Sequence, residues 1–183
     1  MNPLIEYQQP PGAYAFHTTK EENADAIRED GIKHAIDTSS TTSSVERALS
    51  KLGYDSPFPF NRTAVTYCGV DAEFTGKMFS SHPSSEIHTN NDSVAIVVDV
   101  QAIIAPMYLA DMTLASDLID YVYGGAGVML HADTPEEAVE QYRESITPVE
   151  TPDDIASHAN TLTHAELVVD GDIPPSAIVD VVQ

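Results

Sequence analysis

Residues 163–175 read THAELVVDGDIPP, from Thr163 to Pro175. The apolar run from Ala165 to Val169 predicts a strand, and the glycine and prolines after it predict a turn. Glu166 is the exception in this strand, because burying a carboxylate costs free energy unless the group is paired. Either Glu166 points to solvent from a half-exposed strand, or the strand holds it for a chemical reason.

Outward from this stretch, the chain mixes strands and helices in irregular order. The nearly continuous apolar run 94–100 predicts a central strand. Because no βαβ regularity appears, the sequence predicts an α+β fold, and its length fits a single domain over 1–183. Further strands are expected at 13–16, 62–68 and 177–182, and helices at 72–79 and 115–122. Capping boxes predict helix starts at Thr19, Ser43, Thr134 and Thr151, the first two helices ending at Gly31 and Gly53.

The composition is strongly acidic. The 183 residues include 8 Lys and Arg against 29 Asp and Glu, for a net charge of −21. Disordered acidic chains are poor in apolar residues, whereas this one is 42% hydrophobic with its carboxylates spread along the chain. An acidic surface suits a salt-rich cytoplasm, so a halophilic source is expected, with an acidic inhibitor or DNA mimic as the alternative. No basic stripe supports tight binding of nucleic acid at ordinary salt.

Several common functional patterns are missing from the sequence. The seven histidines show no HxxxH or HExxH spacing, and Cys68 is the one cysteine, so no metal is expected. Gly124-Gly125-Ala126-Gly127 lacks the lysine of a phosphate-binding loop and reads as a flexible turn. With no signal-peptide pattern and no apolar run fit to span a bilayer, a soluble cytoplasmic protein is expected.

A second segment completes the candidate site. Phe16-His17-Thr18-Thr19-Lys20-Glu21-Glu22-Asn23 places a histidine where a short strand leads into a capped helix. Together with the stretch around Glu166, it resembles the ADP-ribosyltransferase (ART) superfamily, and most of all its DarT-like DNA-targeting toxins. The family's first motif is similar to Phe16, His17, Thr19, Asn23 and Gly31, and its last motif to Ala165-Glu166-Leu167-Val168 with Pro174-Pro175. Its middle motifs are similar to Pro57, Phe58, Phe60 and Arg62, and to a turn at Ala110-Asp111.

The resemblance implies an ART-like split β-sheet core with flanking helices, and NAD as a substrate. A carboxylate beside the ribose stabilises the oxocarbenium-like transition state as nicotinamide leaves, and the resemblance gives this role to Glu166. Arg62 is the second catalytic candidate, pairing with the pyrophosphate or orienting the acceptor. His17, Thr19 and Asn23 would bind NAD, and Tyr67 is a candidate for stacking on nicotinamide, although a strand tyrosine is more often core.

The implied reaction is mono-ADP-ribosyl transfer, as by a toxin with an antitoxin partner or by a virus-encoded effector. Lys20 departs from the family, in which a second histidine is frequent at this position. The acceptor stays open between a nucleic-acid base, an RNA end, a protein side chain and a small molecule, and stacking on Phe58 and Phe60 could replace missing positive charge. The alternative is a catalytically inactive ART-like domain, or an unrelated α+β protein that binds a partner.

Overall fold

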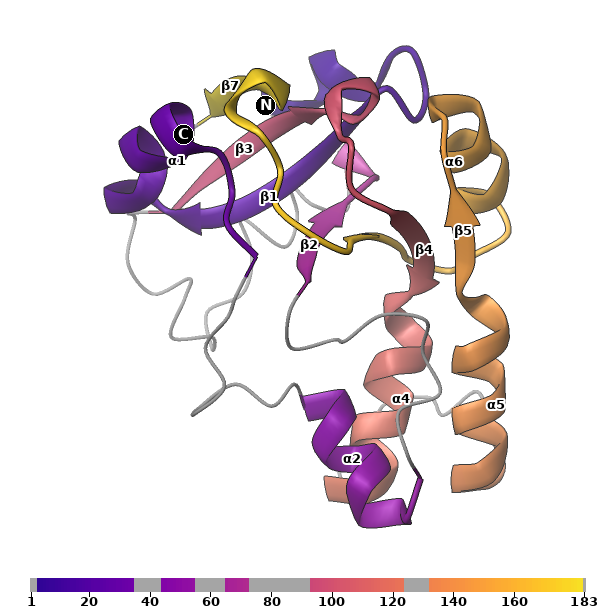
Figure 1. The fold of residues 1–183 in the computed structure, drawn as a ribbon. Helices are drawn as coiled ribbons and strands as arrows, with labels where there is room; N and C mark the ends of the chain where they lie inside the picture. The colour runs from indigo at the N-terminus through magenta and orange to yellow at the C-terminus, as the bar shows by residue number, and fades with distance from the viewer. Residues whose placement is uncertain (1–2, 35–43, 55–64, 73–92, 124–131, 183) are drawn as a thin grey trace.

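The computed structural model describes residues 3–34, 44–54, 65–72, 93–123 and 132–182 (Figure 1). Within these ranges seven strands form one antiparallel sheet, in the order β5-β4-β6-β2-β1-β3-β7. The strands are β1 (Tyr14–Lys20), β2 (Thr66–Gly69), β3 (Ser93–Asp99), β4 (Met107–Asp111), β5 (Thr147–Val149), β6 (Ala165–Val169) and β7 (Ile178–Val182). The helices are α1 (Ala24–Asp30), α2 (Ser44–Leu52), α4 (Met112–Tyr123), α5 (Pro135–Ser145) and α6 (Pro152–Ala159). Short 3-10 turns are η1 (Pro3–Gln8), η2 (Glu21–Asn23), η3 (Val100–Ala102) and η4 (Pro175–Ala177).

The sheet is nearly divided between β1 and β2. On one side of this division β1 pairs with β3 over seven residue pairs, from Tyr14↔Asp99 to Lys20↔Ser93, and β3 pairs with β7. On the other side lie β2, β6, β4 and β5. The two halves meet in the single register pair Phe16↔Gly69, and β2 runs at an angle to β1 (Figure 1). The predicted α+β class is confirmed, and the near-division matches the expected split core.

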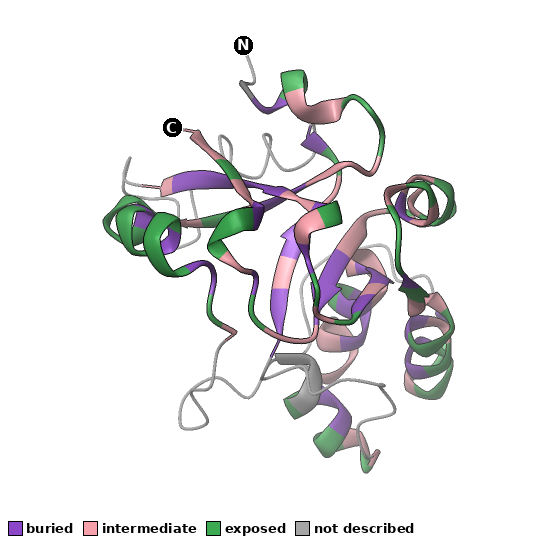
Figure 2. Cartoon of the chain, turned by 45° about the horizontal axis from the view of Figure 1, so that its top comes forward, coloured by how far each residue is buried: buried purple, intermediate pink, exposed green. Residues whose placement is uncertain are grey.

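Side-chain alternation sends the apolar residues of the strands to two faces, and helices cover both. One face contains Leu109 and Leu167, which form a core with Ile27 of α1 and Ile155 of α6. The other face packs Val168 against α2, α4 and α5, and a smaller cluster joins Phe16, Ala95 and Val97 to Leu4 of η1. Figure 2 shows the buried residues concentrated in the strands and the exposed ones on the outer sides of the helices.

Local capping chemistry decides where two of the helices begin. Thr151 and Asp154 form a complete capping box at α6, in which the hydroxyl of Thr151 accepts from the Asp154 amide and the Asp154 carboxylate accepts from the Thr151 amide. Thr134 likewise accepts from the Glu137 amide at the start of α5. These two predicted starts are confirmed. The helix expected between Ser43 and Gly53 is observed as α2, and its predicted end at Gly53 is confirmed, where φ is 80°. Ser43, its predicted cap, lies outside the described residues.

The predicted helix start at Thr19 is wrong. Strand β1 continues to Lys20, because its ladder with β3 extends to the pair Lys20↔Ser93. Turn η2 follows without a side-chain cap, and α1 begins only at Ala24. Its predicted end at Gly31 is confirmed, where φ is 78°. A hydrogen-bonded ladder thus prevails over a local capping pattern.

Two strands were not anticipated, and part of the sequence falls outside the described residues. Ala110 and Asp111, expected in a turn, lie at the end of β4, and the chain passes directly into α4. The short β5 was also missed.

The strand expected at 62–68 is confirmed from Thr66 onward. The proline-phenylalanine loop with Arg62, most of the helix expected at 72–79, and the glycine-rich run 124–127 lie outside the described ranges.

Candidate functional site

One row of paired residues across the strands, here called a rung, joins the two motif segments. Glu166 on β6 pairs with Gly69 on β2 and with Ala110 on β4. Gly69 in turn pairs with Phe16, the residue before His17. Because neighbouring strands lie 4.7–4.9 Å apart, β1 and β6 are separated by about 10 Å. Residues from the two ends of the chain therefore meet at the centre of the sheet.

The side chain of Glu166 is half-buried, and its Oε2 atom is shut off from solvent. Its neighbour in register on β2 is Gly69, which contributes no side chain beside it. The adjacent thiol of Cys68 is fully buried, and burial together with the negative charge of Glu166 raises the pKa of Cys68 to about 12. Glu166 is therefore not a freely solvated surface glutamate.

His17 is held through one ring nitrogen. Its Nδ1 lies 3.0 Å from the backbone oxygen of Tyr67, where β1 and β2 part. A carbonyl oxygen only accepts, so Nδ1 carries the hydrogen and Nε2 of the neutral ring is an acceptor. Burial lowers the pKa of His17, an effect that the Tyr67 carbonyl opposes. The ring is therefore neutral near neutral pH.

The register also separates the side chains of Glu166 and His17. Residues paired across an antiparallel ladder share a face, so Glu166 leaves the sheet on the same side as Phe16. His17 follows Phe16 and starts from the opposite face. Its ring then turns toward the Tyr67 carbonyl on the neighbouring strand. The structure brings the two motifs into adjacent rungs but does not bring these two side chains onto one face.

The other predicted NAD-binding residues lie at the end of β1, in η2 and on β2. Thr19 is two residues beyond His17 and so lies on the same face of β1, and its Oγ1 accepts from Asn23 Nδ2 at 3.1 Å. Tyr67 offers its backbone oxygen to His17, while its ring packs against the cluster formed with α2, α4 and α5. Arg62, the second catalytic candidate, lies outside the described residues.

Asp111 holds the chain segment that leads into β6, a role that sequence reasoning missed. Its side chain is 4% exposed. Oδ1 accepts from the Thr113 amide at 2.9 Å and caps α4, while Oδ2 accepts from the Thr163 amide at 2.7 Å. The His164 amide lies 3.4 Å from Oδ1, and the His164 ring contacts the Thr113 hydroxyl at 2.7 Å. An aspartate just before a helix is a capping signal that could have indicated the first contact.

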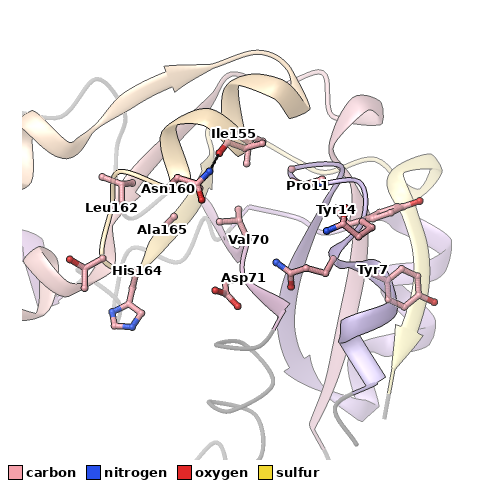
Figure 3. A pocket seen from close by; sticks show the side chains of 16 residues that line it. Tyr7, Pro11, Tyr14, Val70, Asp71, Ile155, Asn160, Leu162, His164 and Ala165 are labelled. Atoms are coloured by element: carbon pink, nitrogen blue, oxygen red, sulfur yellow. Dashed lines mark hydrogen bonds between the residues drawn. The ribbon is translucent and has the colours of Figure 1, made fainter.

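A cavity of about 430 Å³ adjoins the start of β6 (Figure 3). It lies between η1, the end of β2 and α6, and its lining includes Tyr7, Asp71, Asn160 and His164. Ala165 also lines it, although Glu166 and His17 do not. The cavity therefore borders the last motif at Ala165, without including Glu166 or His17 in its lining.

Other kinds of site find little support in the described part of the chain. There, no three His, Cys, Asp or Glu side chains gather in a way that could hold a metal ion. Nor does any helix in the described ranges combine the length and apolar character that crossing a membrane requires.

Comparison with known proteins gives distant structural likenesses. The chain matches no protein-family model and no curated protein. It is similar to the structure of Thermus sp. 2.9 DarT in complex with NAD+, at 13% identity and a TM-score of 0.42, over 94% of this chain and 82% of that one. It is also similar to Thermus sp. 2.9 DarT in complex with ADP-ribosylated ssDNA, at 14% identity and a TM-score of 0.44, over 94% and 81% of the two chains. Likenesses at this level carry no functional conclusion, and the α+β class rests on the sheet and helices themselves.

Proposed function

We propose that this chain is an NAD-dependent mono-ADP-ribosyltransferase that uses NAD as a substrate. The observation that carries the proposal is the rung Phe16–Gly69–Glu166, which joins the two segments that resemble the ART motifs. These segments stand at opposite ends of the sequence, and nothing in their local patterns requires them to meet. Their meeting at the centre of one sheet brings the two segments within about 10 Å of each other, although the side chains of His17 and Glu166 start from opposite faces.

Glu166 has the surroundings that the chemistry requires. During the reaction the bond between the nicotinamide nitrogen and ribose C1′ breaks, and its electron pair leaves with nicotinamide. The acceptor then forms a bond to C1′ and loses a proton to solvent or a base. A carboxylate in a partly dry site stabilises the positive charge that develops on the ribose far better than one in water. The buried Oε2 atom of Glu166 supports this role.

His17 is suited to bind a hydroxyl rather than to carry charge. With its hydrogen on Nδ1 directed to Tyr67, the ring presents Nε2 as an acceptor, which a ribose hydroxyl can meet. Thr19, on the same face of β1, adds a further hydroxyl, which Asn23 orients. A nucleotide that contacts both His17 and Glu166 must therefore reach across the division between β1 and β2.

An inactive ART-like domain is the second candidate, and one observation favours it. Strand alternation starts the side chains of His17 and Glu166 on opposite faces of the sheet. If no ligand spans the division, the domain binds a partner without transferring ADP-ribose. We further propose one domain over 1–183, a cytoplasmic protein of a halophile or its virus, and, for the active form, a toxin with an antitoxin partner.

The test is incubation with labelled NAD at molar KCl, with single-stranded DNA and a protein mixture as separate acceptors. We compare the wild type with Glu166→Gln and with Glu140→Gln, a matched change at an exposed position of α5. Loss of a group that acts on transition-state charge typically lowers the rate by about two to three powers of ten, so Glu166→Gln should nearly abolish nicotinamide release. Glu140→Gln should leave it unchanged.

Two outcomes would contradict the proposal. Unchanged nicotinamide release in both Glu166→Gln and His17→Ala would overturn the site assignment. Binding of NAD without turnover in the wild type would favour the inactive domain. Thermal unfolding of each variant separates a lost reaction from a lost fold, because only the latter lowers the midpoint.

A further inference from the structure

The two faces of the sheet differ in how they join its two halves. On the face covered by α1 and α6, one core contains residues of both halves, among them Ala15 of β1, Cys68 of β2 and Leu167 of β6. On the other face, the buried residues that the structure describes form two separate cores, one with α2, α4 and α5 and one with η1. Packing therefore joins the halves on one face and divides them on the other.

Glu166 starts from the divided face, at the boundary between its two cores. Val168, two residues after Glu166 on β6, belongs to the core with α2, α4 and α5. Phe16 belongs to the core with η1, although it shares a rung with Gly69 and Glu166. The boundary crosses the sheet where backbone pairing is also least, since β1 and β2 have only the register pair Phe16↔Gly69 among the described residues.

Segment η1 packs against both sides of this boundary. Its Leu4 is 2% exposed and forms a core with Phe16 of β1 and with Ala95 and Val97 of β3. The same core includes Ala72, which follows β2 in the other half of the sheet and is fully buried. Leu4 therefore joins side chains from the two halves on the face where their strands are least connected.

Two consecutive residues of η1 form hydrogen bonds to opposite halves of the sheet. The hydroxyl of Tyr7 donates to Asp180 Oδ2 on β7 at 2.6 Å, and the Tyr7 ring meets that of Tyr14 edge to face (Figure 3). Oε1 of Gln8 accepts from the backbone N–H of Ala72 at 3.0 Å. Tyr7 thus holds η1 to its own half, and Gln8 holds it to the other.

The hydrogen bond to the other half is the weaker of the two. The Tyr7 hydroxyl lowers the pKa of Asp180, so its acceptor is an ionised carboxylate at neutral pH. Hydrogen bonds with an ionised partner are roughly twice as strong as those between neutral groups, such as Gln8 and the Ala72 amide. When η1 loosens, it therefore leaves Ala72 before it leaves Asp180.

We propose that η1 is a strap that keeps the divided face closed, and that the hydrogen bond between Gln8 and Ala72 is its release point. When this bond breaks, η1 stays on β7 through Tyr7, and the halves turn about the core that they share on the opposite face. The opening occurs at the rung of Glu166 and makes its side of the sheet accessible. The strap is a property of the fold, so the proposal does not rest on the transferase function.

The experiment measures amide hydrogen exchange in the full chain by NMR, at several urea concentrations below the unfolding transition. An opening confined to the strap exposes little surface, so its free energy should depend weakly on urea. We expect this weak dependence for the amides of β1 and β2 that face the division. The amides of the β3–β7 and β4–β6 ladders, inside each half, should show the stronger dependence of a larger unfolding.

Four variants locate the release point. Gln8→Met keeps the length of the side chain but removes its acceptor oxygen, and loss of one neutral hydrogen bond typically shifts an equilibrium by roughly three- to tenfold. The amides at the division should therefore exchange about that much faster in Gln8→Met. Gln8→Glu keeps an acceptor, and Gln9→Met changes the exposed neighbouring glutamine, so neither should exchange faster than the wild type. Tyr7→Phe should leave the division unchanged, because its bond to Asp180 stays formed in the open state.

Three results would overturn the strap. The first is exchange at the division with the same urea dependence as the ladders inside each half, which the wild type alone can show. The second is exchange at the wild-type rate in Gln8→Met. The third is an acceleration at the division that is equal in Tyr7→Phe and Gln8→Met, which would mean that η1 leaves β7 as well. Thermal unfolding of Gln8→Met and Tyr7→Phe shows whether each variant is folded at the temperature of the measurement.

Discussion

Strands β6 and β1, which carry the two motif residues, are held in different ways. Strand β6 lies in the interior of its half of the sheet, with five register pairs to β4 and four to β2. Strand β1 has seven pairs with β3 but a single pair with β2. The glutamate is thus fixed by ladders on both sides, whereas the histidine stands where the ladder stops. Glu166 is therefore fixed by more backbone pairing than His17 is.

Both ends of β6 are also anchored to distant parts of the chain. Before the strand, Asp111 accepts from the backbone of Thr163 and His164. After it, Ile173 exchanges backbone hydrogen bonds with Ile32 at the end of α1, each 2.9 Å long. In contrast, β1 runs into η2, which has no side-chain cap. The following changes test this contrast.

Removal of the Asp111 carboxylate should have the largest effect. Asp111→Ala removes a buried carboxylate that accepts from the backbone N–H groups of Thr113 and Thr163. Hydrogen bonds to charged groups typically contribute about 1.5–3 kcal/mol each, so we expect a loss of about 3 kcal/mol in the free energy of unfolding. Urea unfolding measures it. Asp111→Asn keeps one acceptor oxygen and should lose less. A value for Asp111→Ala close to that of the wild type would show that β6 needs no anchor at its start.

The anchor after β6 is tested at Gly31. Its φ is 78°, and a Cβ there would lie 2.1 Å from the backbone oxygen of Ile173. Gly31→Ala should therefore cost about 2 kcal/mol, from a strained backbone and a forced shift of the bridge. Gly53→Ala is the matched control, because Gly53 has a φ of 80° and no atom of the described residues lies within 4 Å of the added Cβ. If both variants lose the same amount, the strain lies in the backbone alone.

His17 on β1 should make the free energy of unfolding depend on pH. Burial lowers the pKa of His17 below its ordinary value of 6.5, so the unfolded chain takes up the proton first as pH falls. The free energy of unfolding is therefore highest above pH 6.5, where His17 is neutral in both states. It falls as the pH decreases below 6.5, because only the unfolded chain then takes up the proton. His17→Asn keeps a donor for the Tyr67 oxygen but cannot titrate, so its unfolding free energy should fall less steeply. Parallel profiles would mean that the ring is solvated in the folded state.

Asn23 should have the smallest effect on stability. Its side chain is exposed and donates a hydrogen bond to Thr19 Oγ1. Asn23→Ala should change the free energy of unfolding by less than about 0.5 kcal/mol, as surface substitutions usually do. A larger loss would mean that the β1 end is anchored as firmly as β6, which would remove the contrast between the two strands.

Much of the fold was predictable where local signals and tertiary packing agree. The apolar runs of β3 and β6 and the capping residues Thr134 and Thr151 led to the right elements. Thr19 misled, because the ladder with β3 outweighs its capping pattern. Strand β5 was missed because it is short and contains Pro148, a residue that sheets accept mainly at their edges.

The site was less predictable, because it depends on register. Which residue stands opposite Glu166 is decided by the pairing of β2 with β6, and no local pattern marks Gly69 for that place. The same register puts Glu166 and His17 on opposite faces, a relation that can be worked out only once the rung through Phe16 is known. The contact of Asp111 with the Thr163 amide was similarly hidden, since the two residues lie 52 positions apart in the sequence.

The buried thiol of Cys68 makes the centre of this sheet directly observable. It is the only cysteine of the chain, it pairs with Leu167 on β6, and its pKa of about 12 keeps it in the unreactive thiol form. A thiol reagent can then modify the native protein only during moments when β2 separates from its neighbours. The rate at which Cys68 is labelled therefore measures how often the strands around Glu166 separate. A ligand that bridges these strands should lower that rate.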